Sequence, residues 1–484
     1  MLRTSEAYLQ GLRDGREVYY RGKRVEDVTA HEALGRGARH TAIDFRLAEE
    51  PAHRSLMVVG EGEGAPFSRY FHIPRSAEDL RTRNALIETV TRLGSSFVPL
   101  VKEIGTDALF ALMIVAAQVD RAAGTGYLER VRAFHRYCRD RDLTMAVAQT
   151  DAKGHRGLRP HEQSQPDTYV HVVERRQDGI VVRGAKAHTT NAVYADEIIV
   201  LPTRALGRED ADWAVAFAVP AATRGVRMVA SPRGFSAEST FDNPLSARFA
   251  IVESLTVFED VFVPMERVFL LGEWQAAGPL ARTFVEFHRF TAVSYKPPLL
   301  ELLLGAAALL ADYNGIAGAG HVRDKLVGLV MYLETVRGLT RGAAAECQMK
   351  DGIAVPHVVY ANAAKYYFAA HYHEAVRAVQ DIAGGLVVTA PVEEDWNTPE
   401  TRAMMERYLV GAVGAEERLR AMNLVRDLTA SDLGGYLEVL AIHAEGSLEA
   451  QKLTILGDTD LESHRAYARR LAGIPEAPVS RVRE

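Results

Sequence analysis

The chain has 484 residues, of which 48% are hydrophobic and 25% are charged, the composition of an ordinary globular protein. Its formal net charge of −6, with no long basic run, argues against nucleic acid as the main partner. The two cysteines, Cys138 and Cys347, are too few for a disulfide framework or a self-sufficient iron–sulfur or zinc site. We therefore expect reduced thiols in a cytoplasmic protein of roughly two to four domains.

The sequence pattern does not predict a membrane partner. The N-terminal residues lack the apolar core of a signal peptide. The longest apolar run, residues 297–311, is interrupted by Glu301 and is short for a membrane span. This run is expected to be a buried helix of a bundle.

Residues 1–142 are predicted to be mainly helical. Ser76 is a suitable cap for one helix. Residues 107–119 are almost entirely apolar, which indicates a buried helix. Residues 128–141 carry apolar side chains at helical spacing, with Cys138 among them as a core thiol.

Residues 143–275 carry the pattern of β-strands. Residues 169–174, 179–183 and 197–202 are rich in Val and Ile and are bounded by turn residues. The triplet Gln177-Asp178-Gly179 suits a tight hairpin. Because no helical pattern separates these strands, a barrel or sandwich is favoured over a parallel Rossmann sheet.

From residue 276 to residue 484 the pattern is helical and predicts a bundle. The predicted helices cover residues 281–293, 299–314, 324–346, 361–381, 399–408, 415–428 and 446–454. Gly384-Gly385, followed by Thr389, forms a non-helical break inside this region.

Polar residues gather at the ends of the predicted strands. Gln149-Thr150-Asp151 follows one strand, and residues 186–191, which read Lys-Ala-His-Thr-Thr-Asn, follow another. Polar groups at strand ends commonly line a binding site on a rigid scaffold. On this pattern alone, polar turns of a solvated β-domain explain them equally well.

A set of collinear motifs covers nearly the whole chain. They are TDAKGHRGLRP, DGIVVRGAKAHTT, EIIVLPTRAL, VFEDVFVPMERVFL, HVRDKL, AGGLVVTAP and HAEGS. With these motifs the chain resembles the 4-hydroxyphenylacetate 3-hydroxylase family, most closely its 4-hydroxybutyryl-CoA dehydratase branch. The resemblance implies an α+β, acyl-CoA dehydrogenase-like fold with an N-terminal helical domain (1–142), a central β-barrel (143–275) and a C-terminal helical bundle (276–484). It also implies a flavin-binding homotetramer.

The iron–sulfur ligands of the dehydratase branch are mostly replaced. A Cys-x3-Cys pair of that branch aligns with Pro99 and Glu103, its His with His288, and its last Cys with Tyr295. Iron–sulfur clusters require thiolate ligands, and proline has no ligand atom in its side chain. We therefore expect no iron–sulfur cluster.

The phenol-binding signature of the hydroxylase branch is missing as well. Residues 95–103 read SSFVPLVKE where that branch carries an Arg-Ser/Thr-Pro-Asp-Tyr run. Val147 takes the place of its histidine. The chain thus resembles a third kind of family member, which keeps the flavin scaffold and changes the chemistry.

The resemblance implies FAD, in preference to FMN, as the cofactor, with FADH2 as its reactive form. The implied contacts are Gln149 and Thr150 along the ring, Lys186, Thr189 and Thr190 at its other edge, His155 and Arg156 at phosphate or ribose, and Gly384, Gly385 and Thr389 from a neighbouring subunit. Strand-end hydrogen bonds are the alternative for the two threonines, and a surface ion pair is the alternative for Arg156.

The catalytic candidate is His288, a possible general base. Tyr295 lies seven positions later, so both side chains share one face of a helix. Lys296 supplies a charge, and Glu103 faces these residues if the family geometry holds. The alternative is that His288 only packs a helix.

Three functions fit these observations. The first is a two-component monooxygenase, in which a separate reductase supplies reduced flavin for oxidation of a small, aromatic or heteroaromatic substrate. The second is a cluster-free dehydratase, isomerase or dehydrogenase of a CoA thioester. The third is a flavin-binding homologue without activity.

Overall fold

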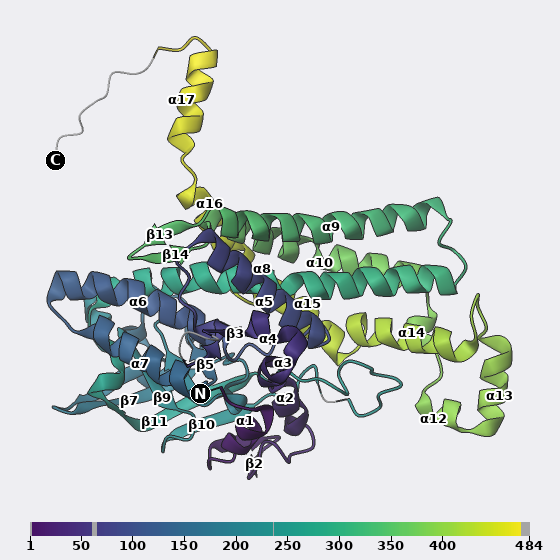
Figure 1. Cartoon of the computed structure of the whole chain (residues 1–484), viewed down its shortest axis with the longest axis horizontal. Coiled ribbons are helices and arrows are strands. Elements are labelled where there is room, and N and C mark those ends of the chain that lie inside the picture. Colours follow the sequence, from purple (N-terminus) through teal and green to yellow (C-terminus); the bar gives the residue numbers. More distant parts are fainter. Residues whose placement is uncertain (1, 61–64, 236, 476–484) are drawn as a thin grey trace.

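The computed structural model describes residues 2–60, 65–235 and 237–475. The described chain forms an N-terminal helical layer, two β-sheets and a helical bundle (Figure 1). The sheets occupy one side of the molecule and the long bundle helices the other. This division creates one long internal boundary between sheets and bundle.

The N-terminal helices begin largely where their capping residues predict. The Thr4 hydroxyl accepts a hydrogen bond from the Ala7 amide, and the Ser76 hydroxyl accepts one from the Asp79 amide. The helices are α1 (Ser5–Gly11), α2 (Leu34–Thr41), α3 (Ile43–Glu49), α4 (Pro51–Met57), α5 (Ala77–Leu93), α6 (Glu103–Ala123) and α7 (Tyr127–Arg141). Cys138 is fully buried in α7.

The N-terminal segment also contributes strands to the central sheet. β1 (Glu17–Tyr20) and β2 (Lys23–Val25) form a hairpin, and β1 pairs in parallel with β10 (Val226–Ala230). The first residues of the chain therefore extend the β-region instead of staying within a separate helical domain.

Two sheets pack face to face around a shared core. The strands are β5 (Met145–Ala148), β6 (His171–Arg175), β7 (Gly179–Lys186), β8 (Glu197–Val200), β9 (Val215–Pro220), β11 (Ser254–Pro264) and β12 (Val268–Leu271), besides β1, β2 and β10. The six-stranded sheet has the order β2-β1-β10-β11-β7-β6, and the four-stranded sheet has the order β12-β9-β8-β5. Phe217 of β9 meets Phe258 of β11 edge to face at 5.8 Å between ring centroids. Within the described residues the strands form this sandwich, one of the two arrangements that the strand pattern favoured, and not the closed barrel that the family resemblance implied.

The four-stranded sheet is covered on both faces. One face packs against the six-stranded sheet, and the other packs against α6, α7 and α8 (Trp274–Tyr313). β5 and β8 are buried at every position, and they are apolar except for Glu197, which pairs with Arg267 at 2.7 Å. The end of β5 therefore lies beside the boundary with the bundle.

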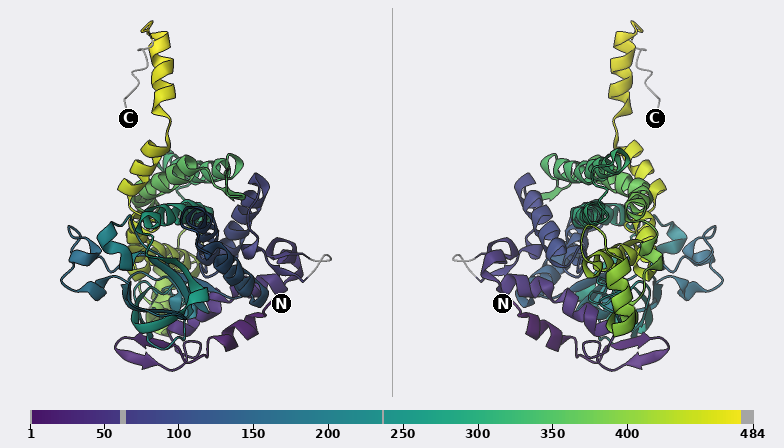
Figure 2. Two further views of the ribbon diagram at one scale, coloured as in Figure 1. Left: turned by 90° about the vertical axis from the view of Figure 1, so that its left-hand side faces the viewer. Right: turned by 90° about the vertical axis from the view of Figure 1, so that its right-hand side faces the viewer.

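The bundle is built on α8, α9 (Gly320–Ala345) and α10 (Val358–Ala383), with α14 (Ala415–Thr429) and α15 (Asp432–His443) packed on them. The smaller elements are α11 (Leu386–Thr389), α12 (Glu393–Asn397), α13 (Pro399–Tyr408), α16 (Leu448–Asp458), α17 (Leu461–Leu471) and the hairpin β13 (Gln348–Lys350) and β14 (Ile353–Val355). α17 projects away from the rest of the chain in each view (Figure 2). α8 is apolar and long enough to cross a membrane by composition, but most of its apolar window is buried inside the protein.

α8 runs unbroken through Pro297 and Pro298, where the sequence predicted two helices. Pro297 has no N–H to donate to the carbonyl of Val293. That carbonyl instead accepts a hydrogen bond of 3.2 Å from the Thr340 hydroxyl on α9. A neighbouring helix thus satisfies the polar group that proline leaves unpaired.

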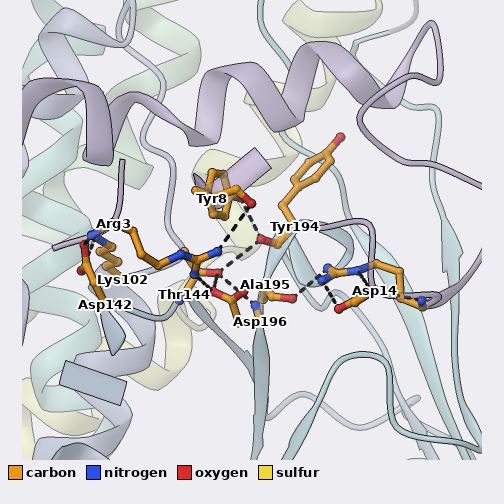
Figure 3. Close-up of polar contacts among 10 residues, drawn as sticks. Arg3, Tyr8, Asp14, Lys102, Asp142, Thr144, Tyr194, Ala195 and Asp196 are labelled. Atoms are coloured by element: carbon orange, nitrogen blue, oxygen red, sulfur yellow. Dashed lines mark hydrogen bonds and ion pairs between the residues drawn. The ribbon is translucent and has the colours of Figure 1, made fainter. Parts of the chain in front are cut away.

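Ion pairs attach the N-terminus to the start of the β-region (Figure 3). The Arg3 guanidinium contacts Asp196 at 2.7 Å, and the Arg3 amide donates to Asp142. Asp142 also accepts from the buried ammonium of Lys102 at 2.7 Å. Asp196 in turn accepts from the hydroxyl and amide of Thr144, just before β5. These contacts fix the starts of α6 and β5, the two elements that lead into the site.

Candidate active site

A buried carboxylate joins three elements of the bundle. Glu445 lies in the loop after α15 and accepts a hydrogen bond from the Tyr295 hydroxyl of α8. The Lys296 ammonium, also on α8, lies 3.2 Å from the same carboxylate, and the Lys365 ammonium of α10 lies 3.6 Å from it. Lys365 also donates to the Ala441 carbonyl at 2.8 Å. We call Tyr295, Lys296, Lys365 and Glu445 the buried quartet.

The quartet brings two cations to a single carboxylate. Burial raises the pKa of Glu445, but the ammonium groups of Lys296 and Lys365 outweigh burial and lower this pKa to about 2. Burial lowers the pKa of Lys365 to about 8 and also lowers that of Lys296, with Glu445 opposing both shifts. Burial and the Glu445 charge raise the pKa of Tyr295. At neutral pH the site therefore holds an ionised carboxylate beside a neutral phenol.

A second carboxylate approaches from the β-region. Glu253, just before β11, accepts hydrogen bonds from the Thr190 hydroxyl at 3.0 Å and from the Tyr436 hydroxyl at 3.1 Å. Burial raises the pKa of Glu253. Both Glu253 and Tyr436 act electrostatically on Tyr295, so this group lies beside the quartet. The boundary between sheets and bundle is thus lined with titratable groups from both sides.

His288 lies against a buried aspartate. Its Nδ1 is 3.6 Å from the Asp107 carboxylate of α6, and its ring stacks on Phe284. The other oxygen of Asp107 accepts from Arg83 at 2.8 Å and from the Thr291 hydroxyl at 3.0 Å. His288 lies seven residues before Tyr295 on α8, so both side chains share one face of that helix, and its charge also lowers the pKa of Glu445 after the larger effects of the two lysines. His288, Tyr295 and Lys296 all lie on α8, and the catalytic role that the sequence assigned to them stays a prediction.

Glu103 belongs to a neighbouring group of buried acids. Its carboxylate accepts from the Tyr70 hydroxyl at 3.1 Å and from the Lys102 amide. Burial, and then the charge of Glu103, raise the pKa of Asp44 well above its usual value. Burial also raises the pKa of Glu103. Among the described residues Glu103 has no hydrogen bond to the quartet or to His288, so its direct partners differ from those that the sequence suggested.

Lys186 holds the strand ends in place. Its ammonium donates to the Gln149 carbonyl at 2.8 Å, to Asp151 at 2.7 Å and to the Leu201 carbonyl at 2.9 Å. These bonds use all three donors of the ammonium, which leaves none for a ligand. The Ala187 amide adds a bond to the Thr150 carbonyl at 2.9 Å. In this structure Lys186 fixes the segment 149–151 through bonds within the protein.

Thr189 carries an unused polar group at this boundary. Its hydroxyl is buried and has no hydrogen-bond partner in the described chain. The neighbouring backbone is fixed, because the Thr189 amide donates to the Ser254 carbonyl at 3.0 Å. A buried hydroxyl without a partner costs free energy unless a ligand supplies one. This feature fits the edge of a flavin ring.

The other predicted cofactor residues lie on the surface. His155 and Arg156 are exposed in the loop after β5. Gly384 ends α10 with a φ of +83°, which favours glycine, and an added Cβ there would meet nothing within 4 Å. The Thr389 hydroxyl bonds back to the Gly385 carbonyl. Within one chain Gly384, Gly385 and Thr389 follow the end of α10, whereas Lys365 lies near its start, so these three residues are remote from the buried quartet.

Five residues of the site were not predicted from the sequence. They are Asp107, Glu253, Lys365, Tyr436 and Glu445. Two of them could have been found in the sequence. Glu445 lies in the motif HAEGS, and Lys365 is the single lysine in the mostly apolar run ANAAKYYF. Across the described residues, no group of three or more His, Cys, Asp or Glu side chains is placed to hold a metal ion.

The helical layer, the β-sandwich and the bundle define an acyl-CoA dehydrogenase-like fold. The chain belongs to the 4-hydroxyphenylacetate 3-hydroxylase family, whose N-terminal profile matches residues 4–270 and whose C-terminal profile matches residues 277–473.

Relatives with different activities are similar over almost the whole length. The 4-hydroxybutyryl-CoA dehydratase/vinylacetyl-CoA-Δ-isomerase of Clostridium aminobutyricum is 32% identical, over 98% of this chain and 100% of its own. The 4-hydroxyphenylacetate 3-monooxygenase oxygenase component of Thermus thermophilus is 31% identical, over 91% of each chain. A crystal structure of such an oxygenase component complexed with FAD has a TM-score of 0.90 at 29% identity, covering 97% of this chain and 98% of that one.

Glu445→Gln tests the charge balance of the quartet. Removing one partner of a buried ion pair leaves Lys296 and Lys365 uncompensated, so we expect a loss of about 3–5 kcal/mol in the free energy of unfolding near pH 7. With a folded pKa of about 2, Glu445 stabilises the fold fully above its unfolded pKa and loses this contribution as the pH falls toward 2. The difference between variant and wild type should therefore shrink in acid.

Chemical denaturation between pH 7 and pH 3 measures this difference. Glu174→Gln is the matched control, because Glu174 pairs with Arg176 on the exposed β6–β7 hairpin. It should change stability little, because an exposed ion pair contributes little to the fold. An equally mild effect of Glu445→Gln would mean that the two lysines are compensated in another way.

Proposed function

We propose that this protein is a reduced-flavin-dependent monooxygenase that oxidises a small organic substrate, with an aromatic or heteroaromatic ring as the expected class. This proposal depends on which residues occupy the positions that align with the iron–sulfur ligands of the dehydratase branch, and on what those residues bond to. Pro99 has no ligand atom, the Glu103 carboxylate is bonded to Tyr70, and the Tyr295 hydroxyl is bonded to Glu445. Without those thiolates the scaffold has no ligands for the cluster, and flavin chemistry is what remains for it to perform.

The chain offers a suitable place for FAD at the boundary between sheets and bundle. Gln149 and Thr150 would lie along the ring, and the unpaired hydroxyl of Thr189 and the Thr190–Glu253 pair would meet its edge. When bound, the reduced flavin would supply the electrons that activate oxygen. His288 would accept or return a proton at its imidazole, and Tyr295 and Lys296 would present a hydroxyl and a charge beside the substrate.

A second candidate function is supported by a specific observation. The likeness to the dehydratase extends over 98% of this chain, and Lys296, Glu445 and His288 could serve acid–base chemistry without oxygen. A cluster-free dehydratase, isomerase or dehydrogenase of a CoA thioester would use these residues. The two functions differ in whether oxygen is consumed.

The proposed monooxygenase has two kinds of partner. A separate flavin reductase would supply the reduced flavin, as the term oxygenase component implies for relatives such as the Thermus protein. The second partner is the small-molecule substrate. We propose that the protein acts in the cytoplasm, because its free cysteines Cys138 and Cys347 suit a reducing compartment.

Isotope labelling decides between the two functions. Protein loaded with reduced FAD is mixed with ¹⁸O₂ and a panel of phenols, and separately, without oxygen, with hydroxyacyl-CoA thioesters. The monooxygenase should place one labelled oxygen atom in its product. Conversion of a thioester without oxygen would establish the second function. Flavin binding without turnover of any compound in either panel would favour an inactive homologue.

His288→Ala tests the proposed acid–base group. Flavin binding should change little, because the ring contacts proposed above lie in the β-region. Substrate oxidation per reduced flavin consumed should fall by about 10²-fold or more, the usual scale for a positioned acid–base residue. His371→Ala is the control, because among the described residues the hydrogen bond of this partly buried histidine goes to the Tyr367 carbonyl in its own helix. Normal coupling in His288→Ala would leave His288 as a packing residue.

We further propose a homotetramer built as a dimer of dimers. Three features support it. α9 exposes Val327 by 56% and Met331 by 61%, more apolar surface than a solvent-facing helix needs. α17 buries none of its described residues, although isolated helices of this length are marginal in water. The segment around Gly384 and Thr389 would gain a role by meeting the flavin of a neighbouring subunit.

Light scattering on three variants tests the assembly. Truncation after Thr459 removes α17, and Val327→Glu with Met331→Glu places charges on α9. Either change should shift the tetramer toward smaller species, and Tyr467→Ala alone should have an intermediate effect. Wild-type protein that remains a monomer at micromolar concentration with full affinity for FAD would rule the assembly out.

A further inference from the structure

A groove with a cavity volume of about 490 Å³ lies between the helices α5 and α9. This volume falls within the usual range of small-molecule sites, about 300–1,000 Å³. Residues of α5 and α9 alone line the groove, and none of them belongs to the candidate active site described above. We call this feature the α5–α9 groove.

Small residues on both helices leave the groove open. Ala85 of α5 and Gly342, Ala344 and Ala345 of α9 line its walls. Residues three and four positions apart share one face of a helix, so Arg341, Ala344 and Ala345 point the same way. Side chains of one carbon or none leave a slot between two packed helices, which a larger residue would fill. The walls of this slot are therefore apolar.

Arg341 brings an unpaired positive charge to the groove. Its side chain is exposed, and in the part of the chain that the structure describes its guanidinium has neither an ion pair nor a hydrogen bond. Arg81, which lines the groove from α5, is held instead by Glu78 at 2.8 Å. The five N–H donors of a guanidinium form a planar fork that matches a carboxylate. Arg341 thus has all of these donors free for a ligand.

The acid that lines the groove is already compensated. The Glu88 carboxylate lies 3.0 Å from the Arg92 guanidinium and 3.2 Å from the Arg337 guanidinium. Two cations therefore balance the charge of Glu88 within the protein, whereas no acid balances Arg341 among the described residues. This asymmetry favours an anion in the groove over a cation.

Asn84 adds a buried donor without a partner. It lines the groove, and only 9% of its surface is exposed. Its side-chain nitrogen has no hydrogen-bond partner in the described chain. A buried N–H group that lacks an acceptor costs free energy, and an oxygen atom of a ligand would remove this cost. The amide therefore indicates a ligand that carries an acceptor oxygen.

We propose that the α5–α9 groove binds an organic carboxylate with a small, flat apolar body. The carboxylate pairs with the Arg341 guanidinium and accepts from the Asn84 amide, and the apolar body lies between Ala85 and the small residues of α9. An inorganic anion would satisfy the polar groups and leave the apolar slot empty. The inference goes beyond the proposed function, because the groove shares no residue with the candidate active site.

Fluorescence titration with two matched probes tests the proposal on the full chain. 2-Naphthoate and 2-naphthamide have nearly the same shape and differ in charge. Arg341→Gln removes the proposed cation, and Ala345→Leu fills the slot at an exposed position where leucine is a good helix former. Arg323→Gln is the control, since it removes the same charge from an exposed position of α9 about 27 Å away along the helix.

Wild type should bind 2-naphthoate more tightly than 2-naphthamide, and higher salt should weaken 2-naphthoate alone. We expect Arg341→Gln to lose about 10-fold in affinity for 2-naphthoate, with little change for 2-naphthamide, because only the carboxylate pairs with the guanidinium. Ala345→Leu should lose affinity for both probes, and Arg323→Gln for neither. Saturation with FAD should leave the affinity for 2-naphthoate unchanged, whether or not the protein proves to be a monooxygenase.

Asn84→Leu separates a binding role of the amide from a structural one. Leucine has a similar shape and removes a buried polar group that has no partner, so the thermal unfolding temperature without probe should stay equal or rise. The affinity for 2-naphthoate should fall. A lower unfolding temperature with unchanged affinity would mean that the amide supports the fold and not a ligand.

Four outcomes would overturn the inference. They are equal affinity of wild type and Arg341→Gln for 2-naphthoate, an equal loss in Arg323→Gln, displacement of 2-naphthoate by FAD, and no binding of either probe to wild type. Light scattering on Arg341→Gln and Ala345→Leu covers the remaining occupant. A change of assembly in these variants without a change in probe affinity would assign the groove to a second copy of the chain and would also overturn the inference.

Discussion

The charge of Glu445 is the constraint on which the site depends. Two lysines could not remain buried in the bundle as cations without it, because an unpaired buried charge costs far more than a hydrogen bond returns. Glu445 supplies the compensation from a residue with a φ of +54°, a conformation rarely adopted by a residue with a side chain. The Arg289 side chain donates to the backbone carbonyl of Glu445 at 3.1 Å and so supports this conformation. One carboxylate therefore fixes the spacing of α8 and α10 and the loop after α15.

Single helices and hairpins could be predicted, because the capping and turn residues that start them are neighbours in the sequence. Ser76 caps α5 through its own hydroxyl, and Gly179 begins β7 directly after the turn of the β6–β7 hairpin. The continuity of α8 could not be predicted, because it depends on Thr340 of another helix. The pairing of β1 with β10 was also out of reach, since the two strands are about two hundred residues apart and nothing in the first strand identifies its partner.

The candidate site was predicted only where the family alignment reached. The alignment singled out His288, Tyr295 and Lys296, which lie on α8, and Thr190, which bonds to Glu253, whereas Glu445 and Glu253 were missed. The reason is physical: a carboxylate in a surface loop and one buried between two lysines look alike in a sequence. Lys186 shows the opposite case, since its place beside the strand end was foreseen but its three donors are occupied by the protein.

Two of the three replaced cluster positions, Glu103 and Tyr295, are occupied by groups that carry protons. Tyr295 is held as a neutral phenol against Glu445, and Glu103 shares a buried pocket with Tyr70 and Asp44, where burial raises the pKa of all three groups. A thiolate set holds a metal cluster by charge donation, whereas these groups can hold and release protons near the flavin boundary. Glu103 begins α6 and Tyr295 lies in α8, so these replaced positions belong to two helices that the rest of the fold already holds in place. In this fold, chemistry can therefore change without any change in the elements that position it.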